Sequence, residues 1–275
     1  MDPGPVRDVL TVLVGVGTGV LSAAFGVGGA VVSTPAIRAL GVPALLAVGT
    51  TLPSIFPSAV TGTVRYVKED LILWRVVVVT APAGIASAVV GASLADDVPG
   101  EGHLLMVLTA LLLGYTSVRM ARSAGSARVS AARWRSRRRP ANEPEASATP
   151  APSTPLLVAV GIVAGFMSGL LGIGGGVVMV PGFTELGKLP LKAAIATSLA
   201  CVAIFALPST ITHALNDNID WRVALFLTIG VIPGARFGAA AAVKASDEGL
   251  RKAVAGFLGI IAVVYLVGEL LALFD

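Results

Sequence analysis

Two glycine-rich stretches in otherwise apolar sequence carry the pattern with the clearest chemistry in this chain. They read FGVGGAVVSTP at positions 25–35 and LGIGGGVVMVP at positions 171–181. Each glycine costs a helix interior about 1 kcal/mol relative to alanine, so a helix that reaches either stretch is expected to break there. A break frees backbone N–H groups, and the helix that restarts behind it directs its positive N-terminal end at the gap. The glycines concerned are Gly26, Gly28, Gly29, Gly172, Gly174, Gly175 and Gly176.

Two such breaks facing each other inside a membrane form a site for an anion, an arrangement that many secondary transporters use. The alternative is that the glycines only allow helices to pack closely, as small residues do in membranes. A single glycine pair favours packing. Two copies at matched positions, closed by Pro35 and Pro181, favour a binding site.

Hydroxyl side chains accompany both glycine-rich stretches. Thr50 and Thr51 follow the first stretch, and Thr197 and Ser198 recur at the corresponding positions after the second. Hydroxyl groups together with helix N-termini suit a small oxyanion. A Ser or Thr within a helix more often bonds a carbonyl of its own helix. The recurrence in both halves makes these four residues the candidates for substrate binding.

Charged groups are scarce in the apolar segments. Arg236 is the most deeply placed cation, about 22 Å along its expected helix by helical rise. It either pairs with a bound anion or extends to the cytoplasmic headgroups. The predicted core contains no carboxylate, and proton-coupled carriers usually keep a carboxylate or histidine in the path. We therefore expect the membrane potential to drive the export of an anion.

The composition indicates an integral membrane protein. Hydrophobic residues make up 55% of the 275 positions and charged residues only 13%, with a mean hydropathy of +0.86, whereas soluble domains carry about 25% charged residues. The net charge of +4 comes largely from an arginine-rich segment beside a membrane helix, which indicates orientation rather than nucleic-acid binding. The single cysteine, Cys201, excludes a disulfide within the chain.

The apolar blocks predict an all-α polytopic membrane protein with two repeats. Each repeat has four long transmembrane helices and one short helix after the glycine-rich break. In residues 1–121 we expect long helices at 8–25, 44–64, 71–95 and 103–120 and the short helix at 30–40. In residues 155–275 we expect long helices at 155–172, 190–213, 221–243 and 250–273 and the short helix at 176–187. Residues 122–154 are basic and then rich in Pro, Ala, Ser and Thr, which predicts a flexible cytoplasmic linker.

Constant numerical offsets reveal the repeat. Gly26, Gly28, Gly29 and Pro35 each lie 146 positions before their counterparts. After the short helix the offset becomes 147, in a set of pairs that includes Thr50/Thr197, Asp70/Asp217, Trp74/Trp221 and Gly91/Gly238. Agreement at glycine, proline and tryptophan together indicates a duplicated unit.

Loop charges place equivalent loops on opposite sides of the membrane. The arginines of the linker predict a cytoplasmic position. The loop at 96–101 is acidic and lacks Lys and Arg, whereas its counterpart carries Lys244, Arg251 and Lys252. The two repeats are therefore predicted to be inverted. Inversion needs an odd number of crossings per repeat, which we expect the short helices to supply. It places the C-terminus outside, and His213 in an outer loop.

The two motifs GVGGAVVSTP and GIGGGVVMVP, each followed by a hydroxyl pair (GTT, ATS), and the later IPGARFGA resemble the TauE/SafE sulfite exporter family of membrane permeases. The resemblance covers both repeats and leaves out the linker. It implies a plasma-membrane exporter of sulfite, sulfoacetate or a related organosulfur anion. The first repeat departs from the second at Ala30, where the second has Gly176, so the two sites need not contribute equally.

Two other functions fit parts of the pattern. A passive anion channel shares every local feature and differs in flux that neither saturates nor shows counterflow. An intramembrane hydrolase needs Ser168 and His213 as nucleophile and base, but GFMSG misses the rhomboid-type G-x-S-G spacing by one residue. We expect no enzyme activity, cofactor, metal or nucleic-acid partner. The expected partners are a small anion and membrane lipid, and the sequence predicts no oligomeric state.

The inverted topology makes a prediction about labelling. In a Cys201→Ser background, Pro140→Cys should react with an impermeant maleimide only from the cytoplasmic side. Asp275→Cys should react only from the outside, because the charge pattern puts the two positions on opposite faces. Labelling of both from the same side would contradict the inversion.

Overall fold

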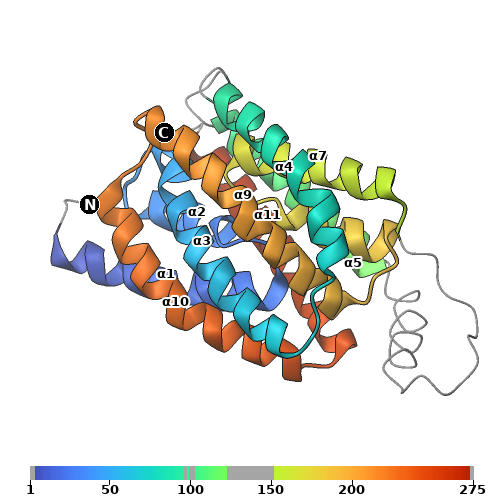
Figure 1. The fold of residues 1–275 in the computed structure, drawn as a ribbon. Helices are drawn as coiled ribbons and strands as arrows, with labels where there is room; N and C mark the ends of the chain where they lie inside the picture. The colour runs from blue at the N-terminus through green and yellow to red at the C-terminus, as the bar shows by residue number, and fades with distance from the viewer. Residues whose placement is uncertain (1–3, 96–97, 99–102, 123–151, 273–275) are drawn as a thin grey trace, which may run out of the picture.

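The computed structural model describes residues 4–95, 98, 103–122 and 152–272, and every regular element in them is a helix (Figure 1). The first repeat contains α1 (Pro5–Phe25), α2 (Ala30–Ala39), α3 (Ala44–Lys68), α4 (Trp74–Leu94) and α5 (His103–Arg122). The second contains α7 (Thr154–Leu171), α8 (Gly176–Pro181), the π-helical turn η1 (Gly182–Leu186), α9 (Leu191–Leu215), α10 (Trp221–Lys244) and α11 (Asp247–Ala272). Most of the predicted linker and the C-terminal end lie outside the described residues.

Eight of the described helices are long and apolar enough to cross a membrane. The predicted all-α polytopic membrane protein is therefore confirmed. The helix ends differ slightly from those expected. In particular, α9 continues to Leu215, and the second short helix divides after Pro181 into α8 and η1, whereas α2 continues past the equivalent Pro35.

Each main contact between helices has an equivalent contact made by the corresponding helices of the other repeat. Helix α1 packs along α10, and its counterpart α7 packs along α4. Likewise α3 contacts α10 as α9 contacts α4, while α3 contacts α9 and α5 contacts α11. Each repeat thus builds its main contacts with the other repeat, and the helices interleave in one bundle (Figure 1).

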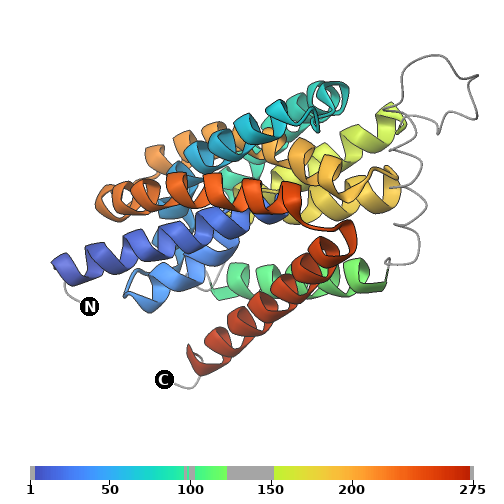
Figure 2. The same ribbon diagram turned by 90° about the horizontal axis from the view of Figure 1, so that it is seen from below.

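The direction of each repeat along the bundle is visible in Figures 1 and 2. The start of α1 and the end of α11 lie at one end, and the end of α5 and the start of α7 lie at the other. Each repeat therefore carries the chain along the bundle once, in opposite directions. This is the placement that an inverted pair requires, and the orientation of the bundle in a membrane stays a prediction.

Glycines allow the helices paired between the two repeats, α1 with α10 and α7 with α4, to touch through their backbones. A Cβ atom on Gly19 of α1 would overlap the carbonyl oxygen of Val231 in α10, and one on Gly165 of α7 would overlap that of Gly84 in α4. Close approach of backbones through small residues is a main source of helix association in lipid. These two interfaces hold α1 and α7, the helices that lead into the two glycine-rich breaks.

Two glycines on the same helix provide a matched test of this packing. Gly19→Ala should destabilise the protein by about 1–3 kcal/mol through overpacking, because Val231 backbone atoms occupy the position of the new methyl group. Gly17→Ala should be neutral or slightly stabilising, because nothing lies within 4 Å of its Cβ position. Thermal unfolding of both variants in detergent measures the difference. Equal melting temperatures would contradict the close packing of Gly19 against α10.

Candidate functional site

Each glycine-rich stretch forms a non-helical turn between a long helix and a short one. The first turn (residues 26–29) joins α1 to α2, and the second turn (residues 172–175) joins α7 to α8. The backbone dihedral φ is +83° at Gly28 and +81° at Gly174, a conformation that costs other L-residues about 1–2 kcal/mol. Glycine is therefore needed at these positions for the chain to turn.

The short helices turn back instead of completing a crossing. A Cβ on Gly182, after α8, would lie 3.1 Å from Val160 near the start of α7, so α8 and η1 return along the helix that precedes them. Helix α2 likewise lies back toward the end of the bundle where α1 begins (Figures 1 and 2). The inversion of the two repeats stays a prediction. With the short helices turned back in this way, the odd number of crossings that it requires would have to come from the three long helices that follow each hairpin.

The two turns touch each other at the centre of the protein. A Cβ on Gly28 would lie 2.6 Å from the carbonyl oxygen of Ile173 and 3.2 Å from the Cα atom of Gly174. A Cβ on Gly176 would overlap the backbone of Gly26 and Val27. All residues from 26 to 29 and from 172 to 176 are buried. The structure therefore brings Gly26 and Gly28 of the first turn against Gly176 and Gly174 of the second. The other three predicted glycines are buried nearby but face other residues: Gly29 faces Thr18, Gly172 faces Val48 and Gly175 faces Ala164.

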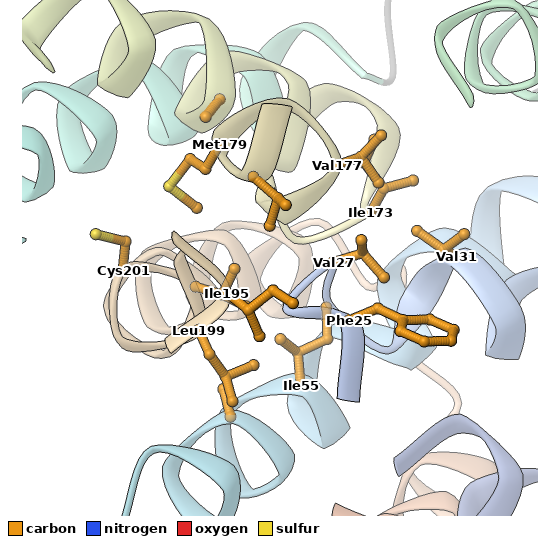
Figure 3. Close-up of a cluster of buried hydrophobic side chains, with 14 of the residues drawn as sticks. Phe25, Val27, Val31, Ile55, Ile173, Val177, Met179, Ile195, Leu199 and Cys201 are labelled. Carbon is orange, nitrogen blue, oxygen red and sulfur yellow. The ribbon is translucent and has the colours of Figure 1, made fainter. Parts of the chain in front are cut away.

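Apolar side chains fill the space around this contact. Val27 and Ile173, one from each turn, are 1% and 0% exposed. Figure 3 shows them within a cluster that includes Val31, Ile55, Val177, Ile195 and Leu199. This packing leaves the contact between the turns closed and apolar.

Thr50 and Thr197 hold helix ends of the opposite repeat. The N–H of Asp220, at the start of α10, donates to Thr50 Oγ1 at 2.9 Å. The N–H of Leu73, at the start of α4, donates to Thr197 Oγ1 at 3.1 Å. These equivalent bonds give both threonines a structural role that the sequence did not reveal.

The other two predicted hydroxyl residues lie closer to the turns. Ser198 Oγ donates to the carbonyl oxygen of Gly26 at 2.8 Å, so the second repeat holds the first turn. Thr51 Oγ1 donates to Val48 in its own helix at 2.9 Å and lies 3.4 Å from Thr34 Oγ1. The alternative of a bond to the residue's own helix thus applies to Thr51 and not to Ser198.

Arg236 is not brought to the turns. It is exposed on α10, whereas the neighbouring Gly234 and Gly238 pack against α1. A residue two positions from each glycine points about 200° away from it around the helix. The geometry therefore favours the extension of Arg236 towards headgroups over the pairing of Arg236 with an anion at the turns.

His213 was expected in an outer loop, and that expectation is wrong. The residue is fully buried because α9 continues beyond it, and its Nε2 lies 3.3 Å from the carbonyl oxygen of Gly169, near the end of α7. Its counterpart in the first repeat is Tyr66, whose hydroxyl donates to Ala23 at 2.7 Å near the end of α1. Both side chains therefore support the last turn of a helix just before a break.

A separate apolar hollow of about 320 Å³ lies between α5, α7 and α8–η1. At its rim the guanidinium of Arg119 pairs with Glu185 of η1. None of the residues predicted to bind substrate lines this hollow, although Val178 and Pro181 of α8 do. The hollow is thus distinct from the contact between the turns.

A model of the family described as sulfite exporter TauE/SafE matches residues 11–265. The chain belongs to the TauE/SafE sulfite exporter family. The match spans both repeats and both glycine-rich turns, so the resemblance seen in the motifs is confirmed over nearly the whole chain.

Relatives in this family carry transporter names. A probable membrane transporter protein of Xylella fastidiosa (strain 9a5c) is 28% identical over 93% of this chain and 91% of its own length. The probable membrane transporter proteins YunE of Bacillus subtilis and MJ0441 of Methanocaldococcus jannaschii are 25% and 24% identical, over 84% and 94% of this chain and 87% and 94% of their own lengths. No solved structure matches the chain. This TauE/SafE protein is thus a multi-pass membrane transporter rather than an enzyme.

Proposed function

We propose that this transporter exports a small sulfur oxyanion, such as sulfite or sulfoacetate, across the plasma membrane, and that the anion binds where the two turns meet. The observation that carries the proposal is the contact between two broken helices, each with a short helix starting at it. The family name supports the substrate class, because it describes sulfite exporters.

The surroundings of the turns suit an anion better than a cation. Helix N-termini attract negative charge, and buried hydroxyls from both repeats lie near the turns. Among the buried residues of the described chain there is no Asp or Glu to form a cation site, and the buried His213 has its Nε2 3.3 Å from the carbonyl oxygen of Gly169 in α7. An oxyanion can accept hydrogen bonds from both kinds of donor.

The closed packing favours a carrier over a passive channel. The apolar cluster around Val27 and Ile173 blocks the centre. A carrier exposes such a site to one side at a time by moving one part of the bundle against the other. The two hairpins are the parts that meet there, so their movement would open the site. Saturating flux with counterflow in liposomes distinguishes this carrier from a channel.

Alanine at Gly28 or Gly174 tests the location of the site. Both substitutions strain the turn, because φ is positive at both residues, and the new methyl group at Gly28 also meets the Ile173 carbonyl. We expect each variant to bind sulfite at least about tenfold more weakly, because the methyl group displaces the backbone at the contact proposed to hold the anion, and a loss of about 1.4 kcal/mol of binding free energy is tenfold in affinity. Gly17→Ala is the control. Wild-type affinity in both turn variants would show that the glycines serve packing alone.

A separate experiment tests whether the membrane potential drives the export. An anion leaving a cell that is negative inside gains about 2.3 kcal/mol per charge per 100 mV, enough to drive a dianion against a more than thousandfold gradient at about 100 mV. Sulfite flux in proteoliposomes should therefore follow a potassium–valinomycin potential. Flux that ignores the potential and follows an imposed pH gradient would contradict potential-driven export and point to proton coupling.

A further inference from the structure

The two repeats share a backbone plan but differ in the polarity of their turns. Thr18 and Ser22 of α1 lie beside the first turn, and their counterparts beside the second are Ala164 and Ser168. Farther along, the first short helix carries Ser33 and Thr34, where the second carries Met179 and Val180. Hydroxyl groups are therefore concentrated at the first turn.

Thr18 and Ser22 are buried polar side chains without a hydrogen-bond partner. They are 0% and 1% exposed, and neither hydroxyl oxygen has a partner within the described chain. They lie against the N-terminus of α2: a Cβ on Gly29 would be 2.9 Å from Thr18 Cγ2 and 3.9 Å from Ser22 Oγ. Buried hydroxyls are ordinarily paired, so two orphans at one helix end need an explanation.

Backbone donors at the same place are unpaired as well. The N–H groups of Val32 and Ser33 bond the carbonyl oxygen of Gly29, but those of Ala30 and Val31 have no acceptor among the described residues. In the second repeat the N–H of Gly176, the counterpart of Ala30, donates to Gly174 at 2.9 Å. The N–H of Val177, the counterpart of Val31, has no backbone acceptor among the described residues. The first turn thus has one more free backbone donor than the second.

We propose that the first repeat alone supplies the oxyanion site, formed by the hydroxyls of Thr18 and Ser22 and the N–H groups of Ala30 and Val31. The proposal rests on the function proposed above and adds two residues that the glycine and hydroxyl motifs did not indicate. An –SO₃ group offers three acceptor oxygens, which these four donors satisfy without a cation. The second turn forms the apolar wall of the site.

The closed conformation leaves no room for the ligand, because the Thr18 methyl group lies against Gly29 and Val27 is buried beside the second turn. The site opens when α2 moves away from α1. The anion then takes the place between them and pairs the donors that the closed conformation leaves unpaired.

Ser22 and Ser168 provide a matched pair for the test, since both are buried, unpartnered and equivalent in the repeat. The measurements are the rise in melting temperature of the purified full chain with sulfite or sulfoacetate, and the KM for uptake into proteoliposomes. Ser22→Ala and Thr18→Ala should each weaken binding about tenfold, and Thr18→Ser should retain it. Ser168→Ala should stay within about twofold of wild type.

A structural role for the two hydroxyls predicts a different result. Removing an unpaired buried hydroxyl should leave the ligand-free melting temperature unchanged or raise it, so a marked fall in Ser22→Ala, which removes the hydroxyl alone, would overturn the inference. Equal losses of affinity at Ser22 and Ser168 would overturn it in favour of a symmetric site. Unchanged affinity in both first-repeat variants would overturn it while leaving the proposed function standing. A wild-type protein that neither binds nor carries either anion would overturn the proposed function, and this inference with it.

Discussion

Non-helical backbone in an apolar core is the constraint on which the rest of this structure depends. In a membrane interior an unpaired N–H or C=O group has no water to bond and costs several kcal/mol. Here the partners come partly from the opposite repeat: Ser198 holds the carbonyl of Gly26, and Thr50 and Thr197 accept the N–H groups that start α10 and α4. Neither repeat satisfies its own backbone alone, which explains why the two halves interleave rather than pack as separate bundles.

The interleaving also determines which parts can move together. Helix α1 of the first hairpin is held against α10 through glycine contacts with the opposite repeat, and α7 is held against α4 in the same way. The short helices are attached differently: α2 contacts mainly α3 and α1, whereas Gly176 at the start of α8 packs against the backbone of Gly26 and Val27. The opening proposed above therefore falls to α2, which lacks the glycine contacts that hold α1 and α7 to the opposite repeat.

Local signals in the sequence predicted most of the fold and part of the site. Apolar length and the cost of glycine in a helix are properties of single segments, so the helices and both breaks could be located. The 146 and 147 offsets gave the repeat. The pairing of Thr50 with Asp220, 170 positions apart, depends on packing between repeats and has no local signal. The burial of His213 was missed because α9 continues past it. Arg236 could have been placed outward, since Gly230, Gly234 and Gly238 define the packed face of α10.

The asymmetry of the turns has a physical advantage for moving an anion. Two equivalent sites in touching turns would hold two anions close together, and two unit charges 4 Å apart repel by about 4 kcal/mol at an effective dielectric constant of 20. A second occupied site would then weaken the first. With Ala164, Met179 and Val180 at the second turn, the site proposed at the first turn would avoid this repulsion while the duplicated scaffold keeps its two-fold packing. In that proposal a symmetric framework supports the exchange of conformations while a single polar turn binds one anion at a time.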